Sequence, residues 1–305
     1  MKSLSMIRRV RGYLAQRRAL GFRLRSEGYL LLNFARYADR CGERGPLTSK
    51  LAITWACLPK GADRHRWARR LEAVRRLAKF LALADPATEL PPRHLFGPSK
   101  QLYKPFLYSA KQVAQLLAAA RRLSGKLRPR TYQTLIGLLA STGLRVSEAL
   151  HLKVEEVDLQ QGLLLIREGK FGQTRWVPLH PTALPPLRLY HQQRQKYFPL
   201  AERFFTSESG TPLLYSTVNA VFSRLRRTIF CQGRPPRIHD LRHTHACRVL
   251  QHWQASRQGA EGRALILSRY LGHRHVRDTY WYLHALPELM AGAGKRFEPD
   301  DYEKH

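Results

Sequence analysis

Apolar residues recur every three or four positions through the first 85 residues, with arginines between them. This spacing is typical of amphipathic helices, and it predicts helices at residues 4–18, 24–41, 49–57 and 64–84. A stretch with five prolines follows, from Asp85 to Phe106. Because proline interrupts helices and central strands, we expect an extended linker at 89–106 and a first domain that ends at residue 88.

The helix predicted at 64–84 has an apolar side and a cationic side. Its apolar positions are Leu71, Val74, Leu77, Phe80 and Leu81, and the cations interleaved with them are Arg69, Arg70, Arg75 and Arg76. A buried stripe with a cationic flank suits a helix that follows a phosphate backbone, so these arginines are predicted DNA contacts. A solvated charged face with no partner is the alternative.

The second half of the chain mixes helical and strand patterns. Ser109 suits the N-cap of a helix at 110–123, and Gly143 suits the left-handed position after a helix at 132–142. Residues 163–168 and 175–179 flank the turn at 169–174 and read as a hairpin, after which the pattern is mostly helical to about residue 289. The predicted fold is mainly α with a small β-sheet, in which residues 107–305 form the second domain.

Charge points to a polyanionic partner. The formal net charge is +31 with a pI near 10.9, and residues 1–100, with 22 Lys/Arg and 7 Asp/Glu, hold +15 of it. Nucleic acid is the natural partner for so basic a chain. Charge alone does not separate a DNA enzyme from a ribosomal or nucleoid-coating protein, so the motifs must decide.

Cysteine spacing and hydropathy favour a cytoplasmic protein. Cys41, Cys57, Cys231 and Cys247 form no CxxC pair, which argues against a zinc ribbon and a disulfide framework. The basic N-terminal segment has no apolar core typical of a secretion signal, although an organelle transit peptide is an alternative. No uninterrupted run of 18 apolar residues predicts a membrane span.

Four separated segments carry candidate chemistry. In the first, Thr142–Glu148, Gly143 ends one helix and Arg145 begins the next. A guanidinium beside a helix N-terminus is a strong phosphate seat, and Glu148 lies three residues on, where it can hold the arginine fork in place. In the second segment, Lys170 stands in the glycine-flanked hairpin turn, where its ammonium could protonate a departing oxygen. For Arg145 and Glu148 the alternative is a purely structural ion pair, and for Lys170 it is an ordinary exposed turn lysine.

The third segment contains His239 and Arg242, spaced i and i+3, so that a proton-transfer group shares a face with a fixed cation. A metal site with His239 and His243 at i and i+4 is the alternative, but no third ligand has recognisable spacing. The fourth segment, residues 271–284, brings Tyr280 and Tyr282 close behind His273 in a cation-rich stretch.

Together the motifs TGLRVSEAL, GKFGQTRWVPL, HDLRHTHA and LGHRHVRDTYWYLH resemble those of the tyrosine recombinase family, which includes the phage integrases and Xer-type resolvases. The resemblance covers about residues 107–290. The turn departs from the family pattern, because Phe171 and Gln173 replace its second glycine and a further lysine. By the match, the catalytic positions are Arg145, Lys170, His239, Arg242, His273 and Tyr282, with Glu148 in support.

The resemblance implies a mechanism. Arg145 and Arg242 are expected to bind the two non-bridging phosphate oxygens, and Tyr282 to attack phosphorus and form a 3′-phosphotyrosine. Lys170 would protonate the leaving 5′ oxygen, with His239 as the proton acceptor and His273 as a phosphate ligand. Neither a metal nor another cofactor is implied.

The resemblance also implies an architecture and partners. It predicts a helical core-binding (SAM-like) domain joined to a catalytic domain as a C-shaped clamp on double-stranded DNA. Four copies would assemble on two sites, with or without a related recombinase, to integrate, excise or resolve DNA such as a mobile element in the nucleoid. A type IB topoisomerase and an inactive DNA-binding or architectural protein are the rival interpretations. The apolar tail at 286–297 is expected to dock on a neighbouring subunit or to fold back on its own domain.

Overall fold

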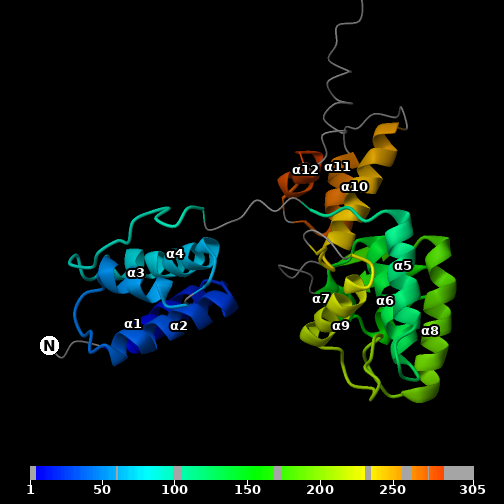
Figure 1. Cartoon of the computed structure of the whole chain (residues 1–305), viewed down its shortest axis with the longest axis horizontal. Coiled ribbons are helices and arrows are strands. Elements are labelled where there is room, and N and C mark those ends of the chain that lie inside the picture. The colour runs from blue at the N-terminus through cyan, green and yellow to red at the C-terminus, as the bar shows by residue number, and fades with distance from the viewer. Residues whose placement is uncertain are drawn as a thin grey trace, which may run out of the picture. The chain divides into compact units, whose positions relative to one another are not determined.

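The computed structural model describes residues 5–59, 61–98, 105–167, 174–230, 235–255, 263–273 and 275–284. The chain forms two compact units, Met1–Tyr103 and Lys104–His305. Figure 1 follows it from the N-terminal unit, blue to cyan, into the C-terminal unit, green to red. Helices make up most of both units, and the C-terminal unit adds a small sheet, so the predicted fold class is confirmed.

The helices of the N-terminal unit are α1 (Met6–Ala19), α2 (Arg25–Arg40), α3 (Ser49–Cys57) and α4 (Arg64–Leu81). The predicted helices are therefore present, and α4 ends three residues early because the chain turns after Leu81. The side chains of Thr48 and Asp63 cap α3 and α4 by accepting backbone N–H groups of their first turns. The apolar faces meet in a core in which Phe34 packs edge-on against Trp55, with ring centroids 5.3 Å apart.

Residues 89–98, expected to be part of the linker, are held against the N-terminal unit, and we call them the 89–98 strap. The backbone N–H of Glu89 donates to Leu47 O (2.8 Å), and its carboxylate accepts the N–H of Ser49 (2.7 Å). Further along, Phe96 packs edge-on against Trp67. The extended segment predicted from the prolines therefore begins as a part of this unit.

The helices of the C-terminal unit are α5 (Ala110–Arg121), α6 (Arg128–Thr142), α7 (Val146–His151), α8 (Leu184–Tyr197), α9 (Tyr215–Arg227), α10 (Asp240–Ala255), α11 (Arg263–Leu271) and α12 (Arg277–His284). Ser109 caps α5 as predicted, and Gln112 completes a capping box. Gly143 ends α6 at φ +63°, the predicted left-handed position. Among the described residues, no helix is both long and apolar enough to cross a membrane.

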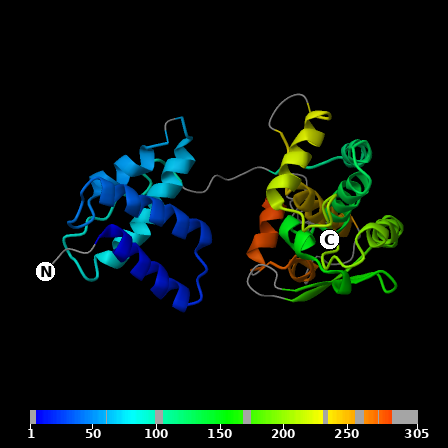
Figure 2. The same ribbon diagram turned by 90° about the horizontal axis from the view of Figure 1, so that it is seen from below.

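The small sheet consists of β1 (Val157–Asp158), β2 (Leu163–Ile166) and β3 (Arg175–Pro178), antiparallel in that order. The strands β2 and β3 form the predicted hairpin, with Leu164 opposite Val177, both buried. The pairing of β1 with β2 was not predicted, because two residues carry no strand pattern. Figure 2 shows the sheet along one side of the unit, where β3 contacts α11.

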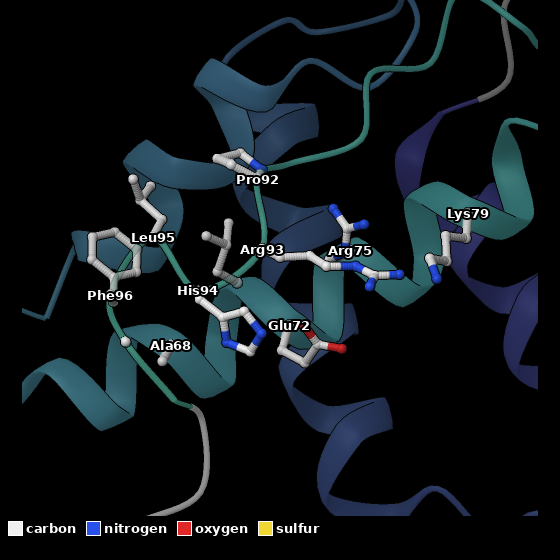
Figure 3. A pocket seen from close by; sticks show the side chains of 11 residues that line it. Ala68, Glu72, Arg75, Lys79, Pro92, Arg93, His94, Leu95 and Phe96 are labelled. Atoms are coloured by element: carbon white, nitrogen blue, oxygen red, sulfur yellow. The ribbon is translucent and has the colours of Figure 1, made fainter.

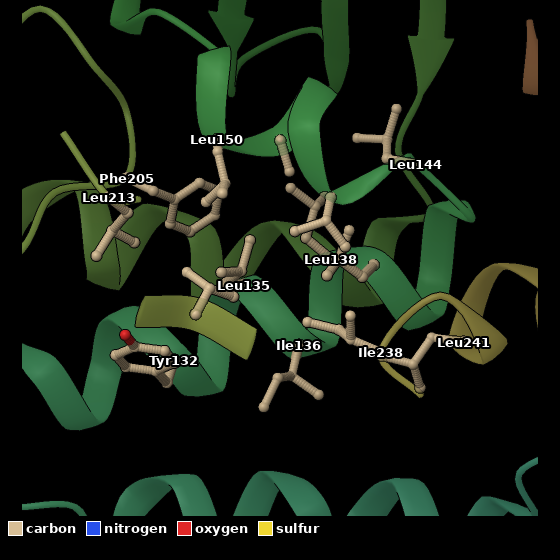
Figure 4. Packing of buried hydrophobic residues seen from close by; sticks show 14 of the residues in the cluster. Tyr132, Leu135, Ile136, Leu138, Leu144, Leu150, Phe205, Leu213, Ile238 and Leu241 are labelled. Atoms are coloured by element: carbon tan, nitrogen blue, oxygen red, sulfur yellow. The ribbon is translucent and has the colours of Figure 1, made fainter. Parts of the chain in front are cut away.

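The core of the C-terminal unit supports the start of two helices that carry candidate residues. Figure 4 shows α6 side chains, including Leu135 and Leu138, packed among Leu144 before α7 and Ile238 and Leu241 at the start of α10. A close-packed core is hardly compressible, so packing against α6 fixes the positions of both helix starts relative to each other. The apolar residues at the starts of α7 and α10 thereby hold Arg145 and Arg242 in place.

Candidate active site

The segment between α6 and α7 places Arg145 as the sequence predicts. After the left-handed turn at Gly143, Arg145 stands at the N-cap of α7, and its backbone N–H donates to Glu148 Oε2 (3.0 Å). Its guanidinium Nη1 donates to Glu148 Oε1 (2.6 Å). The predicted contact between these two residues is confirmed, and it fixes the orientation of the Arg145 fork.

Two arginines about a hundred residues apart in the chain bind the same helix end. Arg145 Nη2 donates to Gly272 O (2.7 Å), and Arg242 Nη2 donates to Leu271 O (2.7 Å). Arg242 Nη1 also donates to Gly143 O (2.8 Å). The Leu271 and Gly272 carbonyls lie at the C-terminal end of α11, the negative end of the helix dipole, which suits cations. The site is thus assembled from the α6–α7 turn, α10 and the end of α11.

A third guanidinium, from Arg175 at the start of β3, was missed by the sequence analysis. Its Nη2 donates to Glu148 Oε2 (2.9 Å), its Nη1 to Glu148 Oε1 (3.2 Å) and its Nε to Tyr270 O (2.8 Å). Arginines are common throughout this chain, and no spacing marks this one. Only the tertiary fold brings it to the carboxylate.

The cluster of Arg145, Arg175, Arg242 and Glu148 carries more positive than negative charge. Burial alone would raise the pKa of Glu148, but its hydrogen bonds and charge contacts with Arg175 and Arg145 more than offset this, and the pKa is lowered. Arg242 is only 2% exposed, and burial followed by the charge of Arg145 lowers its pKa to about 10. One carboxylate faces three guanidinium groups, which leaves an excess of positive charge suited to an anion, and we call this cluster the anion seat.

Tyr282 on α12 lies against this seat. Its side chain is 3% exposed and lies in an apolar cluster with Cys247 and Leu250 of α10. Burial raises the pKa of Tyr282, and the charge of Arg242 opposes that rise. Tyr280 is 47% exposed, so the two tyrosines face different surroundings, as helical geometry predicts.

The rings of two histidines contact Tyr282. The centroids of the His273 and Tyr282 rings lie 6.0 Å apart, and the rings are nearly parallel. His273 Nδ1 shares a 2.7 Å hydrogen bond with Thr279 Oγ1. The His243 ring lies 5.4 Å from Tyr282 and 4.8 Å from the His239 ring. The predicted residues His239 and His273 are therefore brought to one site, and His243 and Thr279 join them. From the sequence, His243 is a candidate metal ligand only, and no spacing marks Thr279.

These histidines are neutral near pH 7. Burial, followed by neighbouring cations such as Arg242, lowers the pKa of His273 to about 3. Burial likewise lowers the pKa of His239 and of His243 to about 4. A neutral imidazole can accept a proton or a hydrogen bond. In the described part of the chain, no group of three or more His, Cys, Asp or Glu side chains is arranged to hold a metal ion.

Lys170 and the apolar tail lie outside the described residues. The strands β2 and β3 that flank the Lys170 turn are antiparallel partners, and β3 begins with Arg175 of the cluster. The predicted role of Lys170 and the predicted docking of the tail at 286–297 therefore stay predictions.

The four arginines predicted as DNA contacts on α4 have different surroundings. Arg70 is buried, 8% exposed, and its guanidinium lies 3.7 Å from the centre of the Trp55 ring while Nη2 donates to Trp55 O (2.6 Å). The structure therefore corrects the prediction for Arg70, because its cation is used inside the N-terminal unit. Arg69 is exposed, and Arg76 is exposed but paired with Glu27 (2.9 Å).

Arg75 lies beside a pocket of the N-terminal unit. It donates a hydrogen bond to Pro91 O and is partly buried. Figure 3 shows Arg75 and Lys79 of α4 near Arg93 and His94 of the 89–98 strap, around a pocket of about 270 Å³. This pocket is lined by residues of the N-terminal unit, whereas the candidate catalytic residues belong to the C-terminal unit.

Known proteins with similar sequences are named as integrases or recombinases. The model described as the phage integrase family matches residues 107–288. The chain is 39% identical to y4rB of Sinorhizobium fredii, named as an integrase/recombinase, over 95% of this chain and 96% of that protein. It is 33% identical to tyrosine recombinase XerD of Rhizobium meliloti over 73% of this chain and 71% of that protein.

The fold has a close counterpart among solved structures. The Tn1549 transposon integrase, solved with transposon right end DNA, matches with a TM-score of 0.72 over 97% of this chain and 100% of that chain, at 15% identity. The mainly helical fold and the matching sequences define a tyrosine site-specific recombinase. The chain belongs to the phage integrase family, as the four motifs predict.

Proposed function

We propose that Tyr282 is the nucleophile with which this recombinase cleaves and rejoins DNA. The Tyr282 oxygen forms a bond to the scissile phosphorus, and the bond from phosphorus to the 5′ oxygen breaks. The products are a 3′-phosphotyrosine and a free 5′-hydroxyl. The 5′-hydroxyl of another strand then attacks the phosphotyrosine, which restores a phosphodiester and releases Tyr282.

The observation that carries this proposal is the anion seat with a tyrosine at its edge. Arg145 and Arg242 are proposed to bind the two non-bridging oxygens of the scissile phosphate, where charge builds as the reaction proceeds. Both guanidinium groups are already held by carbonyls of the same helix end, 2.7 Å away in each case. Because the charge of Arg242 also lowers the pKa of Tyr282 against the effect of burial, nucleophile and phosphate are proposed to share one cation.

Proton transfers are assigned to the surrounding side chains. The Tyr282 proton must leave during attack, and His239 is the proposed acceptor, with His243 between the two rings as a second candidate. Lys170 is the proposed acid for the 5′ oxygen. His273, oriented by Thr279, is proposed to donate a hydrogen bond to the phosphate.

The proposed substrate is double-stranded DNA, and the proposed working form is a tetramer on two DNA sites. The net charge of +31 supports a polyanionic substrate that contacts both units. Strand exchange needs two cleaved duplexes in one complex, which one copy cannot supply with a single nucleophile. Integration, excision or resolution of mobile DNA follows from that exchange.

Strand exchange between two duplexes tests this function. The probes are two labelled duplexes of different length that carry the sequence recovered from covalent adducts on genomic DNA. Wild-type protein is expected to yield recombinant duplexes of new length, and Tyr282→Phe none. On a supercoiled plasmid that carries the same sequence, relaxation without recombinants would indicate a topoisomerase, and binding without cleavage of either DNA would indicate an architectural protein. Either result would contradict the proposal.

A further inference from the structure

Arg175 joins three elements of the site through one side chain. It begins β3, both of its Nη atoms bind Glu148 on α7, and its Nε binds Tyr270 O on α11. The side chain is 10% exposed, so these bonds form largely out of water. Each of the three guanidinium nitrogens thus has a partner on another element.

The carboxylate of Glu148 is shared between two arginines. Its Oε1 accepts from Arg145 (2.6 Å) and Arg175 (3.2 Å), and its Oε2 accepts from Arg175 (2.9 Å) and the backbone N–H of Arg145 (3.0 Å). A carboxylate held on both oxygens cannot rotate freely. Arg175 therefore restrains the same carboxylate to which Arg145 donates.

Gly272 makes room for this arrangement. Its φ of +66° is a left-handed conformation that favours glycine, and a Cβ built there would stand 2.7 Å from Arg175 Nη1. The Gly272 carbonyl accepts from Arg145 on the same turn. Gly272, which follows α11, therefore leaves room for the side chains of both Arg145 and Arg175 at the turn directly before His273.

We infer that Arg175 is a positioning residue for strand cleavage, which acts through Glu148 on Arg145. The inference rests on the proposed role of Arg145 as a ligand of the scissile phosphate. A lysine at 175 keeps the charge but cannot hold both carboxylate oxygens and the Tyr270 carbonyl in one plane. The loss is expected in the rate of cleavage and not in DNA affinity, because the cation stays in place.

The test uses the full chain and a nicked suicide duplex of the sequence that wild-type protein cleaves. Arg175→Lys is compared with Arg167→Lys, a matched control whose Nε pairs with Glu156 Oε1 (3.2 Å) beside the same hairpin. Covalent adduct on the wild-type protein, absent from Tyr282→Phe, establishes the proposed function independently. Arg175→Lys is expected to form adduct about 100-fold more slowly at saturating protein, as misplaced groups do, with Arg167→Lys near wild type. Equal rates for the two variants and the wild type would overturn the inference.

A double-mutant cycle separates positioning from a general structural role. If Arg175 acts through Arg145, Arg175→Lys adds less than a further twofold loss in the Arg145→Ala background. Losses that multiply would overturn the inference. The defect is also expected to be the same on a duplex with a 5′-bridging sulfur, which needs no acid. A defect that disappears with sulfur would show that Arg175 acts through the Lys170 turn instead.

The melting temperature and the DNA affinity of each variant are measured alongside its cleavage rate. Assays run well below the melting temperature of every variant, and dissociation constants are expected to agree within twofold. If Arg175→Lys does not fold, Glu148→Gln tests the same contact from the other side. It keeps the shape of the side chain, and a cleavage rate equal to wild type would overturn the inference.

Discussion

Each unit of this recombinase contains a buried arginine that donates to backbone carbonyls, yet the two residues serve different ends. In the N-terminal unit, Arg70 bonds to Trp55 O and lies over the Trp55 ring. In the C-terminal unit, Arg242 bonds to Gly143 O and Leu271 O, and its charge lowers the pKa of Tyr282 against the effect of burial. Arg145 and Arg175 stand beside it with a single carboxylate.

The difference shows that burial of a cation does not by itself mark a site. Arg70 is stabilised by an aromatic face and a carbonyl, which together complete a folded core. The cations around Arg242 exceed the neighbouring negative charge and adjoin Tyr282, the residue proposed as the nucleophile. Excess charge beside a reactive group is what distinguishes the site from the structural arginine.

The largest expected effect is that of replacing Arg242, and it tests the comparison with Arg70 directly. Arg242→Lys cannot reproduce the bonds to two carbonyls, so adduct formation should fall by about 100-fold to 1,000-fold, as when an oxyanion ligand is removed. Arg70→Lys should cleave at the wild-type rate and melt at a lower temperature. Both are measured by single-turnover adduct formation and thermal melting. A cleavage defect in Arg70→Lys with normal melting would contradict the structural assignment.

A second effect of similar kind concerns Lys170. Lys170→Ala should lose about 100-fold in cleavage of an ordinary phosphodiester, because general acids contribute on that scale. On a duplex with a 5′-bridging sulfur the thiolate leaves without a proton, so the rate should return close to wild type. An equal defect on both substrates would remove the acid role from Lys170.

Stability should depend on pH through the buried histidines. The folded protein holds the pKa of His243 near 4 and of His273 near 3, below the ordinary value of 6.5. From pH 6.5 down to 4, the unfolded chain therefore binds protons that the folded protein does not, and the free energy of unfolding falls. At pH 5 the loss is on the order of 2 kcal/mol after discounting for solvent.

Melting curves between pH 8 and pH 5 measure this loss. His243→Gln should flatten the dependence, since one of the groups that titrates only on unfolding is gone. If the melting temperature of the wild type does not fall from pH 7 to pH 5, the histidines are not held neutral by burial.

The smallest effect lies on α4 and concerns the exposed arginine. Arg69→Ala should lower the slope of log affinity against log salt by about one unit if Arg69 contacts a phosphate. Arg70→Ala should leave the slope unchanged, because its guanidinium is committed to Trp55. Equal slopes for Arg69→Ala and the wild type would remove Arg69 from the DNA interface.

Local patterns predicted much of this molecule. The glycine after α6, the cap of α5 and the hairpin are determined within a few residues, and all were predicted from the sequence. The convergence of Arg145, Arg242, His273 and Tyr282 was predicted through the family motifs. These positions could be matched because each lies in a recognisable segment.

Tertiary packing determined what the sequence did not predict. Arg175 is an arginine in a strand of a very basic chain, and its contact with Glu148 spans 27 residues. Arg70 looked like one of the cations on the flank of α4, and only the position of Trp55 on α3 showed that it is buried. Thr279 received its role from a hydrogen bond to His273 that helical periodicity does not encode.

Identification of the residue joined to DNA tests the central claim most directly. Wild-type protein is trapped on a nicked suicide duplex, digested, and the peptide that carries nucleotides is sequenced by mass spectrometry. The account predicts a 3′-phosphate ester on Tyr282, no adduct with Tyr282→Phe, and a normal yield with Tyr280→Phe. An adduct on Tyr280 or any other residue, or adduct formation by Tyr282→Phe, would contradict it.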